Sequence, residues 1–163
     1  MSLFHLSSLS DISAAEWDAL LPDQQPFLRH AFLLSLEESG SVRPERGWQP
    51  DHLLWREAGV LRAALPGYQK FHSQGEYVFD HAWADACQRA GIPYYPKWLG
   101  AIPFSPVTGA RVLGAADVAA RLLAALPDAL AEQGLSGAHI NFTDPQANAL
   151  LAAQPDWLSR LGC

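Results

Sequence analysis

The segment 51–71, DHLLWREAGVLRAALPGYQKF, constrains the fold more than any other part of the sequence. Residues 53–56 and 60–65 are apolar runs of strand length, separated by a short turn containing Gly59. This spacing predicts a β-hairpin. Pro66 and Gly67 interrupt the second run, which predicts a bulge or an edge position there. The chain is therefore expected to build a sheet around two adjacent antiparallel strands.

Segments of strand and helix character alternate along the rest of the chain. Strands are expected at 4–12, 75–80, 98–104 and 136–142, and helices at 13–21, 27–40, 81–91, 114–134 and 143–154. Ser13 is the expected cap of the first helix, with Glu16 in capping-box position. Asp144 and Pro145 are expected to open the last helix, and Pro127 to kink or break the long one. This order predicts an α/β or α+β domain built around one mixed sheet.

Composition and charge argue against several classes of protein. A chain of 163 residues has the size of one domain. Its net charge is −6 and no run of Lys or Arg forms a basic stripe, so tight binding to DNA or RNA is not expected. The N-terminal residues do not resemble a signal peptide and no stretch reaches the ~18 apolar residues of a membrane span, which favours a cytoplasmic protein. Cys87 and Cys163 do not make a disulfide framework, and Cys87 is expected to be a buried structural thiol.

A metal site is the first chemical hypothesis that the sequence KFHSQGEYVFDHAWAD, residues 70–85, raises. His72 and Glu76 are four residues apart, as are His81 and Asp85. Helical pairs at this spacing can bind zinc, but residues 73–75 favour a turn between the first two. Two ligands on one helix face arise easily by chance, so no metal site is expected.

A small-molecule site is the second hypothesis for this region. Residues 71–104 hold 8 of the 17 aromatic residues of the chain, together with His72, Glu76, Asp80, Asp85 and Lys97. Apolar walls with a few polar groups are typical of such sites. A core with polar caps explains the same composition, and both interpretations remain open.

Tyr94 and Tyr95 precede Pro96 and must be extended rather than helical. One tyrosine ring is expected to face the core and the other a groove. Lys97 could then bind a phosphate or carboxylate, although a solvated lysine is the alternative.

The run PVTGARVLGAAD places Arg111 and Gly114 in an R-x-x-G-x-A spacing just before a helix. Backbone N–H groups at a helix N-terminus can hold a pyrophosphate. The spacing resembles the acetyl-coenzyme A loop of GNAT-type N-acetyltransferases, and a plain Gly-Ala turn is the alternative. Thr108 and Gly109 lie in the rigid turn that precedes it.

Several blocks of the sequence together resemble a bacterial family described as FemAB-like, or peptidoglycan biosynthesis/recognition proteins of the GNAT superfamily. The blocks are PFLRHAFLLSLEESGSV, GWQPDHLL, HSQGEYVFDHAWADACQRAG, YYPK and PFSPVTGARVL. Positions that match the family's motifs are His72, Ser73, Gly75, Glu76, Tyr77, Phe79, Asp80, Trp83, Asp85, Tyr94, Tyr95, Pro96, Lys97, Pro106, Thr108, Gly109 and Arg111. Departures are Gly67, Gln69, Phe71 and His81, so His81 is a poor candidate for a shared role.

The resemblance implies a single GNAT-like domain over residues 1–163, a mixed β-sheet flanked by helices. Family members look about twice as long and contain two such halves, so this chain is expected to correspond to the N-terminal half of a FemAB-like protein. An open sheet edge could then be covered by a second copy of the chain or by a second-half domain.

The resemblance also implies an acyl or aminoacyl transferase with a peptidoglycan-precursor or other small-molecule acceptor. Implied catalytic residues are Glu76, Asp80 and His72. Implied substrate-binding residues are Tyr77, Trp83, Asp85, Tyr94, Tyr95 and Lys97, and implied cofactor-binding residues are Thr108, Gly109, Arg111 and Gly114. No cofactor is expected to be tightly bound, with acetyl-CoA or another acyl donor acting as co-substrate. The alternatives are a non-catalytic recognition or dimerisation domain and an acetyl-CoA-dependent N-acetyltransferase acting on a small amine.

Overall fold

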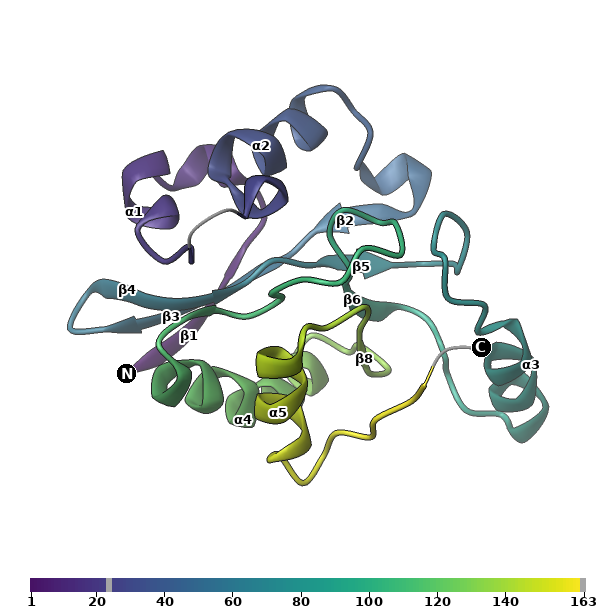
Figure 1. Ribbon diagram of the computed structural model, residues 1–163. Coiled ribbons are helices and arrows are strands. Elements are labelled where there is room, and N and C mark those ends of the chain that lie inside the picture. Colours follow the sequence, from purple (N-terminus) through teal and green to yellow (C-terminus); the bar gives the residue numbers. More distant parts are fainter. Residues whose placement is uncertain (23–24, 162–163) are drawn as a thin grey trace.

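The computed structural model describes residues 1–22 and 25–161, which form a sheet covered by helices on both faces (Figure 1). The strands are β1 (Ser2–Leu6), β2 (Trp48–Pro50), β3 (His52–Glu57), β4 (Val60–Leu65), β5 (Tyr68–Lys70), β6 (Lys97–Gly100), β7 (Leu113–Gly114) and β8 (Ala138–Ile140). The α-helices are α1 (Ala14–Asp18), α2 (His30–Glu38), α3 (His81–Ala90), α4 (Ala116–Glu132) and α5 (Pro145–Ala152). Short 3-10 turns occur at Leu9–Asp11, Pro26–Leu28 and Pro44–Arg46.

The predicted hairpin is confirmed, and it is longer than expected. β3 pairs with β4, and the same two chain segments continue as β2 and β5, which also pair. At the junction the Asp51 N–H donates to the Gly67 carbonyl at 2.9 Å. The strand order is β1-β3-β4-β7 in one sheet and β2-β5-β6-β8 in the other. The single mixed sheet that was expected is thus divided into two segments that share one hairpin.

Gly67 is required at this junction because the Trp98 ring lies against its backbone. A Cβ atom at Gly67 would come within 1.8 Å of that ring. The Trp98 indole N–H donates to the Asp51 carbonyl at 2.9 Å, which fixes the ring across the point where the sheet divides. The unusual glycine therefore makes room for a buried tryptophan.

Each face of the sheet packs against its own hydrophobic cluster. Leu54, Tyr68 and Leu99 pack in the cluster that includes residues of α1 and α2. The cluster on the opposite face includes Trp98 together with residues of α4 and α5. Trp98 and Leu99 are neighbours in β6 and point to opposite faces, as strand alternation requires. Figure 1 shows α1 and α2 on one side of the strands and α4 and α5 on the other.

The predicted helix caps are confirmed. The Ser13 side chain accepts from the Glu16 N–H at 3.2 Å, and Asp144 accepts from the Ala147 N–H at 2.7 Å. The break expected at Pro127 is wrong, since α4 continues through it. Buried side chains on both sides of the proline, including Leu126 and Leu130, hold the helix against the sheet.

The strand expected at 98–104 ends at Gly100, and the strand expected at 4–12 ends at Leu6 and is followed by a 3-10 turn. Two further predictions fail in the segment around α3. Residues 75–80 form turns and bends rather than a strand, because their polar side chains bond to β6, as described below. Cys87 is half-buried rather than buried, on a helix that has no buried residue. Cys163 and residues 23–24 of the expected loop lie outside the described residues. None of the helices in residues 1–22 and 25–161 is both long and apolar enough to cross a membrane.

Candidate functional site: a buried cluster of lysines and carboxylates

The sequence contains only two lysines, Lys70 and Lys97, and the fold buries both at one end of the sheet. Lys70 ends β5, Lys97 begins β6, and the two are register partners in the antiparallel pair. Directly opposed residues project from the same face of a sheet. Their side chains are 0% and 1% exposed. Since lysine is almost never fully buried without a charged partner, the partners of these two ammonium groups define the site.

Lys97 is held by three side chains that follow β5. Its ammonium donates to Ser73 Oγ at 3.1 Å, to Glu76 Oε2 at 3.0 Å and to Asp80 Oδ2 at 2.5 Å. The Glu76 and Asp80 side chains are 2% and 1% exposed. The cost of removing a charge from water is offset only when the charge is both paired and hydrogen-bonded. Lys97 meets both conditions. We call Lys70, Lys97, Glu76 and Asp80 the ammonium–carboxylate cluster.

Lys70 has fewer polar partners than Lys97. Its ammonium donates to the Gln74 carbonyl at 2.8 Å and lies 3.9 Å from Glu76 Oε1. It also lies 3.4 Å from the centre of the Trp48 ring, a close cation–π contact. An aromatic face stabilises the ammonium less than a second carboxylate would, so Lys70 has the weaker set of partners of the two lysines.

Two tyrosines and a histidine border the cluster. Tyr94 donates its hydroxyl hydrogen to Asp80 Oδ2 at 2.6 Å, and the Tyr95 hydroxyl lies 2.5 Å from Ser73 Oγ. His139 comes from β8, which runs parallel to β6. Its Nδ1 atom is 3.7 Å from Asp80 Oδ2, and its side chain is 33% exposed. His139 therefore connects the buried cluster to the surface.

The environment shifts the pKa values of the cluster in opposite directions. Burial lowers the pKa of Lys70 to about 8, and burial raises the pKa of Glu76 above its usual range. Burial also favours the neutral form of Asp80, but hydrogen bonding to Lys97 and Tyr94 outweighs it and lowers that pKa to about 2. The chain thus holds a firmly ionised carboxylate, Asp80, beside a Lys70–Glu76 pair whose proton affinities approach each other. Such contrasts are common at sites of proton transfer.

The pKa of His139 is lowered to about 4, first by burial and then by the charge of Lys97. Its imidazole is therefore neutral near pH 7. A neutral imidazole can accept a hydrogen bond. His139 thus offers an acceptor on the exposed side of the cluster.

Two carboxylate oxygens of the cluster have no hydrogen-bond partner among the described residues. They are Glu76 Oε1 and Asp80 Oδ1, and both atoms are buried. A buried acceptor without a partner carries a desolvation penalty of roughly 1–3 kcal/mol, more for a charged group. The two oxygens are therefore suited to accept hydrogen bonds from a cationic donor such as a primary ammonium.

Of the implied catalytic residues, Glu76 and Asp80 lie in the cluster and His72 does not bond to it. His72 Nδ1 accepts from the Gln74 N–H at 3.1 Å, and Nε2 bonds to the Arg46 carbonyl at 3.1 Å. Both ring nitrogens are thus used to hold the turn. Of the implied substrate-binding residues, Tyr94, Tyr95 and Lys97 belong to the site. The other three, Tyr77, Trp83 and Asp85, are exposed on the segment that covers it.

The implied cofactor-binding residues lie in the connection between β6 and α4. Arg111 is 4% exposed and donates to three carbonyls, those of Asn141 at 2.9 Å, Ala110 at 3.1 Å and Val107 at 2.6 Å. Burial lowers its pKa. The Gly109 N–H donates to the Phe142 carbonyl at 3.1 Å. Arg111 and Gly109 therefore tie this connection to the strand region after β8.

Thr108 and Gly114 complete the implied cofactor set. Thr108 is exposed. Gly114 has φ +105°, and a Cβ there would come within 2.3 Å of the Arg62 carbonyl oxygen of β4. Within residues 1–22 and 25–161, no hydrogen bond or ion pair links any of these four residues to the ammonium–carboxylate cluster.

The sequence reasoning did not select Lys70, Trp48 or His139 as site residues. The sequence did contain one signal for Lys70. The chain has only two lysines, and both lie close in sequence to aromatic and acidic residues. No local pattern marks His139, which reaches Asp80 only through the parallel pairing of β6 with β8. Trp48 faces Lys70 through the strand pairing of β2 with β5.

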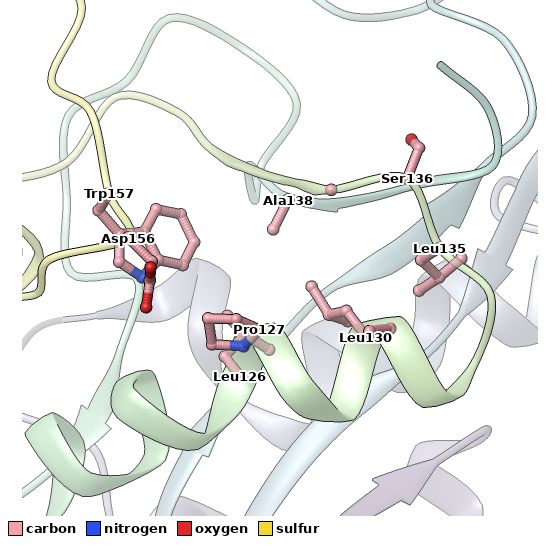
Figure 2. Close-up of a pocket in the computed structure, with 10 residues that line it drawn as sticks. Leu126, Pro127, Leu130, Leu135, Ser136, Ala138, Asp156 and Trp157 are labelled. Carbon is pink, nitrogen blue, oxygen red and sulfur yellow. The ribbon is translucent and has the colours of Figure 1, made fainter. Parts of the chain in front are cut away.

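Two cavities lie elsewhere in the fold. Figure 2 shows the first, of about 260 Å³, where Pro127 and Leu130 of α4 face Ala138 and Trp157. The second, of about 220 Å³, lies between Leu20, Gly114 and Asp144. Neither is lined by residues of the cluster. No group of three or more His, Cys, Asp or Glu residues in the described part of the chain is arranged to hold a metal ion.

Comparison with known proteins gives a family and several structural relatives. The sequence profile of the FemAB-like family, described as peptidoglycan biosynthesis/recognition, matches residues 8–163. The structure is similar to that of a ribosomal-protein-alanine N-acetyltransferase from Brucella melitensis biovar Abortus 2308. The TM-score is 0.50 and the identity 18%, over 98% of this chain and 96% of that one. No curated protein matches the sequence. The structural likeness confirms the expected GNAT-like fold.

Proposed function

Because this chain belongs to the FemAB-like family of peptidoglycan biosynthesis/recognition proteins, we propose that it is an acyl or aminoacyl transferase domain whose acceptor is a primary amine of a peptidoglycan precursor. The fold, which resembles that of an N-acetyltransferase, supports acyl transfer to nitrogen. The family supports the class of acceptor.

The observation that carries the proposal is a pair of buried oxygens beside Lys97, Glu76 Oε1 and Asp80 Oδ1, which have no hydrogen-bond partner among the described residues. An acceptor amine reaches an enzyme mainly as an ammonium ion, and it must lose a proton before it can attack. Glu76 has the raised pKa of a group that can take this proton. Asp80 stays ionised and can orient the ammonium through a hydrogen bond.

The reaction then proceeds in two stages. The acceptor ammonium gives one proton to Glu76, and the neutral nitrogen attacks the acyl carbon of the donor. The new C–N bond forms as the bond from that carbon to the ester oxygen or thioester sulfur breaks, and the leaving group takes the second nitrogen proton. Lys97 lies 3.0 Å from the Glu76 Oε2 atom and stabilises its charge until the proton arrives.

The donor is proposed as an activated acyl ester or thioester. The fold likeness supports an acyl-CoA thioester as the donor, but the residues implied for it fit poorly. All three nitrogens of Arg111 are bonded to carbonyls. Asp144, which caps α5, is among the residues that line the cavity beside Gly114, and its negative charge would repel a phosphate there. We therefore assign the phosphates of coenzyme A to no residue and route no step through them.

Binding of an amine-bearing precursor tests the proposal. The probe is a soluble peptidoglycan stem peptide with its free side-chain amine, and the control is the same peptide with that amine acetylated. We expect the free amine to raise the Tm, because a ligand that binds only the native state stabilises it. The rise should be lost in Glu76→Gln and kept in Glu57→Gln, which changes a glutamate paired with Arg121. Equal shifts with both peptides would refute the amine subsite.

A recognition or dimerisation domain is the second candidate, and one observation favours it. The segment that covers the cluster exposes Tyr77, Phe79, Trp83 and Ile92, each more than half exposed. Exposed aromatic groups of this kind occur at interfaces with other molecules. Light scattering separates the candidates: a dimer that loses its affinity in Phe79→Ser and binds no stem peptide would support recognition over transfer.

A further inference from the structure

We propose that residues 71–93 form a lid that covers Lys70 and Lys97, carries Glu76 and Asp80, and opens as a unit while the sheet stays folded. The lid comprises the turns after β5 and all of α3. This inference goes beyond the proposed function, because it concerns a motion of the protein alone. Its test therefore needs neither a donor nor an acceptor.

The lid packs on the rest of the fold with little apolar contact. α3 has no buried residue, and Tyr77, Phe79 and Trp83 are 61%, 76% and 57% exposed. The residues of the lid that are buried, Ser73 and Asp80, are polar. A segment that buries little apolar surface opens at a lower free energy than the core.

Polar bonds attach the lid to the two lysines. Lys97 bonds to Ser73, Glu76 and Asp80, and Lys70 bonds to the Gln74 carbonyl. On the sheet side, Lys70 and Lys97 stand on paired strands and do not move with the lid. Opening therefore separates lid carboxylates from sheet ammonium groups, and water can replace the broken bonds.

The ends of the lid have the features of hinges. The lid begins where β5 ends, and α3 ends at Gly91, which has φ +69°. The Tyr94 carbonyl beyond it accepts a hydrogen bond from Ser136, which fixes the chain there to the segment before β8. Between these points the lid is joined to the rest of the fold by side-chain bonds. Besides those to the lysines, these are the bonds from His72 to the Arg46 carbonyl, from Tyr94 to Asp80 and between Ser73 and Tyr95. Figure 1 shows α3 at one side of the molecule, apart from the helices that cover the sheet faces.

The closed state hides the groups that the site would offer to a ligand. Glu76 Oε1 and Asp80 Oδ1 are buried and have no hydrogen-bond partner among the described residues. A ligand can reach them only after the lid has moved. Opening is therefore the step that gives access to the site.

Chemical labelling of lysine tests the lid directly, because the sequence contains only Lys70 and Lys97. The intact chain is treated with a water-soluble amine acylating reagent, and labelled residues are counted by mass spectrometry over time. The exposed amino group of Met1 gives an internal reference for reagent activity. The rate of global unfolding comes from amide hydrogen exchange of β3 and β4 in the same sample.

We expect Lys70 and Lys97 to be labelled together, and faster than global unfolding allows. Glu76→Gln should raise this rate roughly tenfold, since it weakens a charge-assisted bond to Lys97. Glu57→Gln, the matched change at an ion pair with Arg121, should leave it unchanged. Asp80→Asn serves as the second variant if Glu76→Gln does not fold. Labelling that proceeds only at the rate of global unfolding, or that rises equally in Glu57→Gln, overturns the lid.

Discussion

Lys97 and Arg111 are two buried cations in the chain segment between the lid and α4, and they differ in the kind of group they bond to. Lys97 is 1% exposed and bonds to three side chains, two of them carboxylates. Arg111 is 4% exposed and bonds to three backbone carbonyls. Side chains can change protonation, exchange partners and move, whereas carbonyls in a packed connection cannot. A buried cation is thus a sign of chemistry only when its partners are themselves able to react.

The largest loss of stability is expected when Lys97 is removed from the ammonium–carboxylate cluster. In Lys97→Met, the Glu76 and Asp80 carboxylates stay buried without their ammonium partner. Removal of one member of a buried pair costs roughly 3–5 kcal/mol. Urea denaturation should show this loss in the free energy of unfolding. A variant that also carries Glu76→Gln and Asp80→Asn should recover much of it, and no recovery would show that Lys97 stabilises the fold through packing alone.

Arg111→Met should cost somewhat less, because it leaves neutral acceptors rather than charges unpaired. Each buried carbonyl without a donor costs about 1–3 kcal/mol, but the loop can relax around some of them, so we expect a total of about 3 kcal/mol. The stem-peptide binding of the surviving folded protein should be unchanged. Lost binding with unchanged stability would contradict the structural role of Arg111.

Low pH should reduce the stability that the ammonium–carboxylate cluster gives to the fold, because it protonates Asp80. The pKa of this carboxyl is about 2 in the fold, against 3.8 ordinarily, so its stabilisation is present above pH 3.8 and is lost as the pH falls toward 2. The difference corresponds to roughly 2 kcal/mol. The stability difference between wild type and Asp80→Asn, measured from pH 5 to 2, should shrink over this window. A constant difference would refute the shift.

Thr108→Ala should have the smallest effect, although Thr108 lies in the same connection as Arg111. Its side chain is exposed, and such substitutions usually change stability by less than about 0.5 kcal/mol. The Tm should therefore match wild type within error. A large loss of affinity for an acyl-CoA in this variant would show that the turn binds the donor after all.

The sequence by itself determined the local structure of this protein. The hairpin of β3 and β4, the caps at Ser13 and Asp144 and the order of the main helices follow from turn residues and apolar period, which act over a few positions. Glu76, Asp80, Tyr94, Tyr95 and Lys97 could also be selected together, because they lie close in the sequence around one helix.

Tertiary structure alone decided which of these residues meet and what joins them. The pairing of β5 with β6 sets Lys70 beside Lys97, and the parallel pairing of β6 with β8 brings His139 to Asp80. The same ion pairs hold residues 75–80 in turns where a strand was expected. Strand pairing between distant segments depends on the whole sheet rather than on neighbours in sequence. Once charged side chains are buried they must be paired, and this requirement outweighs the local preference of residues 75–80 for a strand.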